Sequence, residues 1–292
     1  MEYIAKPART REILQEYGLD PKKGLGQNFL IDLNYLDKII TAAELSPGEK
    51  VVEIGPGIGS LTQFLLEEGV KVLTVEKDRR AVAILQDLLE EYIERGSLQV
   101  INGDALELPW AELNLDEGFR KIVANLPYNI ATPLITRLLE ELSEWQLMVF
   151  MVQREVGERM MAHPGTKSYG SLSIAVQYSA LIEQVALVPP TVFYPRPRVE
   201  SIILRFRPRL EPPVDLLDRG LFCKLVKAAF HQRRKTLKNS LTNSPYVQVS
   251  AAEVEKALAQ LHLDLRIRGE KLSLEEFGHL ANIISQSRTC RS

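Results

Sequence analysis

Hydrophobic residues in the first two thirds of the chain form short runs that alternate with longer amphipathic stretches. The runs are rich in β-branched residues and have the length of buried strands; they cover residues 50–54, 70–75, 98–101, 121–124, 147–152 and 201–206. Between them, stretches such as 79–95 and 132–142 have the periodicity of helices. Strands that alternate with helices predict an α/β fold with a parallel sheet covered on both faces.

The pattern changes after Arg207. Three prolines interrupt residues 208–213, and no further strand is predicted beyond them. Residues 216–241 predict one long helix. We therefore expect two domains: an α/β domain with a helical N-terminal extension over residues 1–210, and a small all-helical domain over residues 211–292.

Two more helices are expected in this second domain, because two serines are each followed three residues later by a glutamate. The pairs are Ser250 with Glu253 and Ser273 with Glu276. In such a capping box each side chain accepts a hydrogen bond from a backbone amide that the first helical turn leaves without a partner.

The composition is that of an ordinary globular protein of 292 residues, with 45% hydrophobic and 25% charged residues. The longest apolar run, 147–152, is too short to cross a bilayer, and no export signal is found, so we expect a cytoplasmic protein. Cys223 and Cys290 are far apart and the four histidines do not pair at ligand spacing, which predicts free thiols and no metal.

The net charge of −2 is unevenly distributed. Residues 193–240 contain twelve basic and four acidic residues, which leaves a net charge of −10 on the rest of the chain. A basic segment on an otherwise acidic protein is typical of a site for a polyanion such as RNA, although a solvated helix face would have the same composition.

A glycine-rich loop, E-I-G-P-G-I-G-S at residues 53–60, follows the first predicted strand. Glycines let the backbone turn sharply and approach a ligand. A dinucleotide fingerprint would place its third glycine at Ser60, and the loop has no basic residue for a pyrophosphate. G-x-G-x-G after an acidic residue is instead typical of methyltransferases, where it receives the amino-acid end of S-adenosylmethionine.

Two acidic residues follow the next two predicted strands. Glu76 can accept two hydrogen bonds from the hydroxyls of a ribose, and Asp104 can accept one from the adenine amine of the same cofactor. Either residue alone would more often be a helix cap or a solvated group. Together with the loop, at the ends of three successive strands, they predict a nucleoside site.

The tetrapeptide N-L-P-Y, which begins at Asn125, follows the fourth predicted strand. The side-chain oxygen of Asn125 and the carbonyl of Leu126 could accept both hydrogens of an adenine amine and direct its lone pair at a sulfonium methyl group. Pro127 would stiffen the turn, and Tyr128 would stack on an extruded base. In isolation this motif would be an ordinary turn, but after the cofactor signature it predicts the target-base site.

With these motifs the sequence resembles the small-subunit ribosomal RNA adenine dimethyltransferases, the kasugamycin-sensitivity family. The similarity runs nearly from end to end. The segments that carry it are 24–30, 53–62, 125–133, 153–159, 169–177, 189–199 and 230–241.

The resemblance implies a Rossmann-like class I methyltransferase domain and assigns roles to further residues. Asn28 and Leu30 would close over S-adenosylmethionine. The other cofactor contacts would be Gly55, Glu76, Asp104 and Asn125. Phe193 would form a second aromatic wall for the target base, although it could equally be a core aromatic beside two prolines.

The family's reaction is two successive methyl transfers to each of two adjacent adenines, in a hairpin near the 3′ end of small-subunit ribosomal RNA. This resemblance predicts an enzyme of ribosome biogenesis that acts on a partly assembled small subunit. We expect a monomer, because a large RNA substrate needs an open face and the sequence shows no self-association surface. Its contacts with the RNA phosphates would be Arg233, Arg234, Lys235 and Lys238.

Three alternatives remain open. The large-subunit adenine methyltransferases of macrolide resistance share the cofactor loop and the N-x-P-Y motif, but the R-R-K-T-L-K-N segment from Arg233 belongs to the small-subunit enzymes. A non-catalytic assembly factor would not need the intact motif at Asn125. A nicotinamide dehydrogenase would need the missing third glycine.

Overall fold

The computed structural model describes residues 2–21, 26–110 and 118–289. Cys290 and the first two residues of the 24–30 segment lie outside these ranges. The chain forms two compact units: unit 1 consists of Met1–Gly157 and Leu181–Pro208, and unit 2 of Glu158–Ala180 and Arg209–Ser292.

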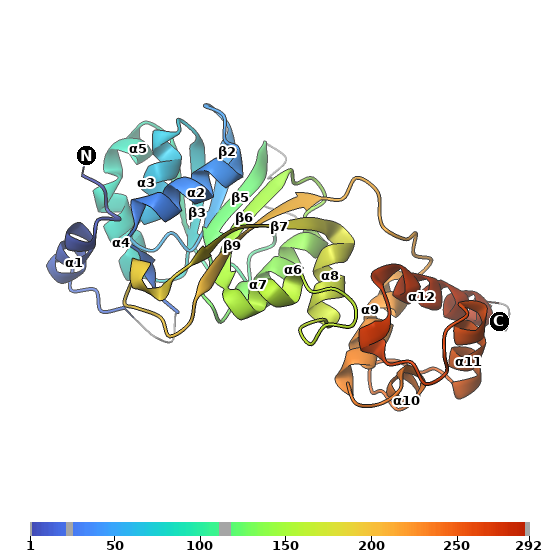
Figure 1. The fold of residues 1–292 in the computed structure, drawn as a ribbon. Coiled ribbons are helices and arrows are strands. Elements are labelled where there is room, and N and C mark those ends of the chain that lie inside the picture. The colour runs from blue at the N-terminus through green and yellow to red at the C-terminus, as the bar shows by residue number, and fades with distance from the viewer. Residues whose placement is uncertain (1, 22–25, 111–117, 290–292) are drawn as a thin grey trace. The chain divides into compact units, whose positions relative to one another are not determined.

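Unit 1 contains a seven-stranded sheet of order β4-β3-β2-β5-β6-β9-β7 (Figure 1). Its strands are β2 (Lys50–Ile54), β3 (Lys71–Glu76), β4 (Leu98–Asn102), β5 (Phe119–Asn125), β6 (Leu147–Gln153), β7 (Ala180–Val188) and β9 (Ser201–Pro208). The six predicted strands are confirmed to within two residues. A separate two-stranded ladder pairs β1 (Phe29–Leu30) with β8 (Phe193–Tyr194).

The predicted parallel pairing is correct from β4 to β6 and wrong for β9, which is antiparallel to β6. β7 was not predicted at all. It is an edge strand with several exposed positions, and Leu181 and Leu187 face solvent. An edge strand lacks the continuous apolar run that marks strands buried on both faces.

Helices cover both faces of the sheet. α2 (Leu33–Ala43) packs against β5, β6 and β9, while α6 (Ala131–Glu141) and α7 (Arg154–Met160) lie on the opposite side (Figure 1). The remaining helices of unit 1 are α1 (Pro7–Glu16), α3 (Ser60–Glu67), α4 (Arg79–Leu88) and α5 (Glu90–Glu94). The sequence predicted α4 and α5 as one helix over residues 79–95, and in the structure this helix is interrupted at Leu89.

The central strand β6 is apolar at consecutive positions, and the contacts of its side chains explain why. Val149 and Met151 belong to the same core cluster as Leu36 of α2. Between them Phe150 points the other way and contacts Phe206 of β9, with ring centroids 5.5 Å apart. Successive side chains of a strand point to opposite faces, so a strand covered on both faces buries every residue.

The parallel strands end along one line. Ile54 of β2 pairs with Val75 of β3, and Glu76 of β3 pairs with Asn102 of β4. On the other side of β2, Glu53 pairs with Val123 of β5. The loops after these four strands therefore leave the sheet at the same edge.

Unit 2 is helical in its described residues. Its helices are α8 (Ser171–Ser179), α9 (Arg219–His231), α10 (Leu237–Thr242), α11 (Ala251–Gln260) and α12 (Leu274–Thr289). They enclose a second hydrophobic core that includes Leu225, Leu237 and Phe277, each fully buried. The Arg154–Met160 helix α7 spans the junction between the units.

The single helix predicted over residues 216–241 is wrong, because the chain leaves the helix after His231 and restarts at Leu237. The Thr236 side chain caps the second helix, and the Leu237 amide donates to the Ile267 carbonyl at 2.7 Å. This bend turns Leu237 into the core. Both predicted capping boxes are confirmed, with Ser250 and Ser273 each bonded reciprocally to the glutamate three residues on.

The compact units differ from the predicted domains over residues 158–180, which pack with unit 2. The Tyr169 hydroxyl donates to the Leu272 carbonyl at 2.9 Å, and its ring contacts Phe230 edge-on. These residues lie between two strands of the sheet in sequence, so strand and helix patterns alone gave no reason to separate them from the first domain.

No helix in the described ranges is long and apolar enough to cross a membrane. Within the same ranges no cluster of histidine, cysteine, aspartate or glutamate could hold a metal ion. Cys223 is exposed.

Gly278→Ala tests the packing of unit 2. A Cβ at this position of α12 would collide with both methyl groups of Val214, so we expect a loss of about 1–3 kcal/mol in the free energy of unfolding. The double variant Gly278→Ala/Val214→Ala, measured by urea denaturation, should lose less than the sum of the two single variants. Additive losses would contradict this packing.

Candidate active site

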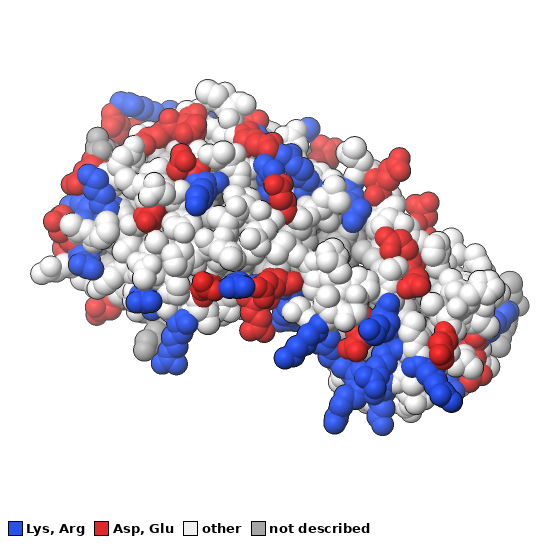
Figure 2. Space-filling view, in the orientation of Figure 1, with Lys and Arg blue, Asp and Glu red and all other residues white. Residues whose placement is uncertain are grey.

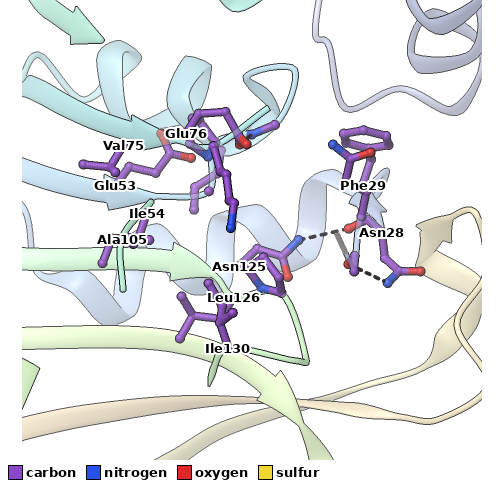
Figure 3. A pocket seen from close by; sticks show the side chains of 18 of the residues that line it. Asn28, Phe29, Glu53, Ile54, Val75, Glu76, Ala105, Asn125, Leu126 and Ile130 are labelled. Carbon is purple, nitrogen blue, oxygen red and sulfur yellow. Dashed lines mark hydrogen bonds between the residues drawn. The ribbon is translucent and has the colours of Figure 1, made fainter. Parts of the chain in front are cut away.

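A cavity in unit 1 opens where the parallel strands end (Figure 3). It brings together eight of the residues singled out in the sequence, although they come from widely separated parts of the chain. They are Asn28, Leu30, Gly55, Glu76, Asp104, Asn125, Leu126 and Tyr128.

The glycine loop is fixed from two sides. Gly57 has a φ of +57°, and a Cβ there would lie 2.9 Å from Cε1 of Phe29, whose ring covers the loop. The Gly57 amide donates to Oε2 of Glu76 at 3.0 Å. The loop after β2 is thus bonded to the acidic residue that ends β3.

Glu76 is 9% exposed, and its other oxygen, Oε1, accepts from the Asp78 amide at 2.8 Å. Burial raises the pKa of this carboxyl, and the hydrogen bonds from the Asp78, Gly57 and Lys77 amides oppose the rise. Each carboxylate oxygen has two acceptor positions, so the fixed carboxylate can still accept from a pair of hydroxyls.

Asp104 is held between an ammonium group and an amide. The Lys77 Nζ lies 2.5 Å from its Oδ2, and the Leu106 amide donates to its Oδ1 at 2.9 Å. Both interactions lower the pKa of Asp104, the Lys77 ammonium most of all. The sequence carries no signal for Lys77, because only the pairing of β3 with β4 brings it to a residue 27 positions away.

Glu53 forms part of the cavity wall but is only 1% exposed. Its Oε2 accepts a hydrogen bond from the Thr62 hydroxyl at 2.6 Å. Burial raises the pKa of Glu53 to about 8, which the Thr62 hydroxyl partly opposes. The carboxyl is therefore neutral below this pH in the free protein.

Asn125 ends β5 with its side chain oriented by the N-terminal segment. Its Nδ2 donates to the Asn28 carbonyl at 3.2 Å (Figure 3), which leaves Oδ1 as an available acceptor. The next residue, Leu126, is buried, and its amide donates to the Met151 carbonyl of β6 at 3.1 Å. The N-terminal segment thus orients the Asn125 side chain, and the sheet fixes the backbone of Leu126.

Pro127 is wedged between two glycines. A Cβ at Gly26 would lie 3.3 Å from the Pro127 Cβ, and one at Gly55 would lie 3.5 Å from the Pro127 Cδ. Both glycines have positive φ, +66° and +71°. The N-terminal segment, the cofactor loop and the N-L-P-Y turn therefore meet at one proline ring.

A family model described as ribosomal RNA adenine dimethylase matches residues 18–286. The chain belongs to this family. It is 48% identical over 285 residues to a ribosomal RNA small subunit methyltransferase A from Halothermothrix orenii, covering 96% of this chain and 94% of that protein.

Two solved structures resemble this dimethylase over most of its length. A dimethyladenosine transferase from Plasmodium falciparum is 28% identical, with a TM-score of 0.71, covering 85% of this chain and 94% of that one. The 23S rRNA methyltransferase ErmE is 25% identical, with a TM-score of 0.63, covering 89% of this chain and all of that one. The predicted class I methyltransferase fold is confirmed.

The dimethylase family uses S-adenosylmethionine, and the cavity fits this cofactor. It offers the fixed carboxylates of Glu76 and Asp104 beside apolar walls such as Ala105 and Leu106. It also contains the hydroxyl of Ser60, a buried polar atom without a hydrogen-bond partner among the described residues. A buried polar group without a hydrogen-bond partner is expected in a cavity where a polar ligand binds.

Two aromatic residues of the dimethylase were predicted to enclose the target base. Tyr128 lines the cavity, and its hydroxyl shares a 2.8 Å hydrogen bond with the Ser201 hydroxyl, which orients the ring. Burial raises the pKa of Tyr128, and the bond to Ser201 partly opposes this. Phe193 is 3% exposed in the core cluster, pairs with Leu30 and does not line the cavity. Its role as a second wall remains a prediction.

The predicted RNA contacts lie in unit 2, where basic side chains gather over α9 and α10 (Figure 2). Two of them have structural partners: Arg233 donates to the Lys167 and Tyr169 carbonyls at 2.9 and 3.0 Å, and Lys238 pairs with Glu255 at 2.9 Å. Arg234 and Lys235 are exposed in the bend between the helices and make no ion pair with a described residue.

Glu53→Gln should change how stability depends on pH. The pKa of this carboxyl is higher in the folded than in the unfolded chain, so its favourable contribution is complete below about pH 4.5 and is lost as pH rises toward 8. The variant, which never ionises, should gain on the order of 3 kcal/mol relative to the unchanged protein between about pH 5 and pH 8.

Urea denaturation without cofactor at both pH values measures this difference. Glu94→Gln, at an exposed position of α5, is the control. A pH-independent difference for Glu53→Gln would mean that the buried carboxyl titrates normally.

Proposed function

We propose that this protein transfers methyl groups from S-adenosylmethionine to the exocyclic amines of two adjacent adenines near the 3′ end of small-subunit ribosomal RNA. The observation that carries the proposal is the orientation of Asn125. Its Nδ2 is bonded to the Asn28 carbonyl, which leaves its Oδ1 as an acceptor, and the next residue, Leu126, lines the same cavity with Asn125. Two fixed acceptors suit a primary or secondary aromatic amine.

S-adenosylmethionine, when bound, supplies an electrophilic methyl group on a sulfonium. Asn125 Oδ1 and the Leu126 carbonyl accept the two hydrogens of the adenine amine and hold its lone pair toward that methyl. A nitrogen–carbon bond forms, the sulfur–carbon bond breaks, and the amine releases one proton to solvent. The protein contributes positioning and electrostatic stabilisation rather than a covalent intermediate.

The same proposal gives the remaining cavity residues their roles. Glu76 binds the ribose hydroxyls and Asp104 the adenine amine of the cofactor. The loop at Gly55 receives the amino-acid end, and Asn28 and Leu30 close over it. The buried setting of Glu76 strengthens such hydrogen bonds because little water competes for them.

Tyr128 stacks on the target adenine after it leaves its own strand. The bond to Ser201 holds the Tyr128 hydroxyl, and Tyr128 lines the cavity. After the first transfer the amine carries a methyl group, which must still fit between Asn125 and Tyr128. A second transfer needs only one remaining hydrogen to be accepted.

The small subunit is favoured as the source of the substrate. The relative from Halothermothrix orenii, named a small-subunit methyltransferase, is 48% identical over nearly the whole chain. ErmE, named a 23S methyltransferase, is 25% identical. We propose that the protein acts as a monomer in the cytoplasm on a partly assembled small subunit.

Methyl transfer to purified ribosomal subunits tests this function. With labelled S-adenosylmethionine we expect dimethyladenine in unmethylated small subunits and none in large subunits, read by mass spectrometry of nucleosides. Asn125→Ala should lower the rate by roughly 10²–10³-fold with RNA affinity nearly unchanged. Asn34→Ala, at an exposed position of α2, is the matched control.

Label only in large subunits would assign the protein to the macrolide-resistance type of enzyme. RNA binding without any transfer would favour a non-catalytic assembly factor. Equal loss of binding and transfer in Asn125→Ala would show that the turn is structural.

We also propose that Arg233, Arg234, Lys235 and Lys238 contact the phosphates of this RNA. Arg234 and Lys235 have no ion-pair partner among described residues, so they can neutralise phosphates without breaking an existing pair. Arg233 has an additional task, because its guanidinium holds the carbonyls of the 158–180 segment.

Arg234→Ala/Lys235→Ala should weaken RNA binding and reduce the slope of log affinity against log salt by about two units, one for each phosphate that is no longer neutralised. The thermal midpoint should stay the same, whereas Arg233→Ala should lower it. The charge-matched control is Lys71→Ala/Arg95→Ala, two exposed residues at the start of β3 and before β4. An unchanged slope would identify the bend as an ordinary solvated surface.

A further inference from the structure

Two residues of the basic segment 193–240 lie in unit 1, whereas the RNA contacts proposed above belong to unit 2. Arg196 and Arg198 are part of a loop, residues 195–200, that joins β8 to β9. Both residues are exposed, and neither makes an ion pair with a described residue. The function proposed above gives these two cations no role.

Both ends of this loop are attached to residues that line the cofactor cavity. At its start, Tyr194 pairs with Phe29 in the ladder of β1 and β8. At its end, the Ser201 hydroxyl shares a hydrogen bond with the hydroxyl of Tyr128, the proposed stacking partner of the target base. The two arginines are therefore held within a few residues of the place where the adenine enters in the proposed reaction.

The loop is restrained along its length as well as at its ends. The Glu200 carbonyl accepts a hydrogen bond from the Arg154 amide at 2.9 Å, and Nη1 of Arg154 lies 2.7 Å from Oε2 of Glu200. A proline precedes each arginine, at positions 195 and 197, and fixes the backbone angle φ there. Because Arg154 neutralises the acidic residue of the loop, its two guanidinium groups are left to attract an anion.

The cavity itself is poorly suited to the phosphates of an RNA strand. Among the described residues that line it, Lys77 is the only cation, and its Nζ is paired with Asp104 at 2.5 Å. The carboxyl group of Glu76 belongs to the same cavity. Since like charges repel, a strand that places an adenine in this cavity needs cations close by for the phosphates on either side of that nucleotide.

We propose that Arg196 and Arg198 bind the phosphates on the two sides of the extruded target adenine. Extrusion breaks the stacking and pairing of the base, and new contacts must offset this cost. The forked donors of a guanidinium match the geometry of a phosphate. These contacts form when the base is in the cavity, so they stabilise the extruded nucleotide. This inference rests on the proposed adenine substrate and concerns the step before methyl transfer.

Binding of a short RNA tests the assignment without any turnover. The probe is a single-stranded trinucleotide whose only two phosphates flank a central adenine, made once in the ordinary form and once with neutral methylphosphonates. Titrations of the whole protein in the presence of S-adenosylhomocysteine give both affinities. The unchanged protein should bind the ordinary form roughly 10-fold or more tightly, as expected for hydrogen bonds between charged groups. Arg196→Ala/Arg198→Ala should bind both forms with the same, weaker affinity.

Lys71→Ala/Arg95→Ala is the charge-matched control. β3 begins at Lys71, whereas the cavity lies where β3 ends. This control should distinguish the two trinucleotides as well as the unchanged protein does. In both variants the affinity for S-adenosylhomocysteine and the thermal midpoint should stay the same, because the exchanged residues are exposed and lie outside the cofactor cavity.

A loop variant that still prefers the ordinary trinucleotide would overturn the proposal, because the phosphates would then be bound elsewhere. Equal affinities of the unchanged protein for both forms would overturn it as well. A lower thermal midpoint with weaker binding of both forms would show that the arginines support the fold. Failure of methyl transfer to small subunits, with the trinucleotide affinities as expected, would reject the proposed ribosomal substrate and leave this site intact.

Discussion

The site depends above all on the parallel pairing of β3, β2 and β5. Ile54 lies opposite Val75, and Glu53 lies opposite Val123, so the three strands end together. A slip of one residue would turn every side chain to the other face of the sheet. Because both faces are buried, the packing that stabilises the sheet also fixes the register. The short loops after the strands start from fixed positions, so the Gly57 amide after β2 reaches Glu76 at the end of β3.

Much of the fold could be predicted from the sequence because strands buried on both faces are continuously apolar and the capping serines mark helix starts. The failures share a cause: they occur where tertiary contacts decide local structure. The exposed edge strand β7 has no distinctive periodicity. The bend before Leu237 exists because that residue is buried in the second core. Residues 158–180 belong to unit 2 through contacts such as Tyr169 with Leu272, which no local pattern reveals.

The candidate site could be predicted from the sequence to the extent that its residues mark the ends of strands. Glu76 and Asn125 are the last residues of β3 and β5, Asp104 closely follows β4, and the structure gathers all three at one cavity. The pairing of Lys77 with Asp104 depends on register and leaves no signal in the sequence. The buried Ser60 hydroxyl is similar, because a small residue after glycine predicts nothing about its hydrogen bonds. Sequence motifs thus identified residues that line the cavity, but not the electrostatic state of the groups around them.

The division of the chain has a consequence for protein engineering. The backbone passes between the units at residues 157–158, 180–181 and 208–209, so unit 2 is assembled from two separate pieces of sequence. A truncation after Pro208 would leave Tyr169 and Ile174 without the core in which they are buried. A hybrid enzyme that exchanges the helical module with a relative must therefore transplant both pieces, because a single crossover point would join halves of two incompatible cores.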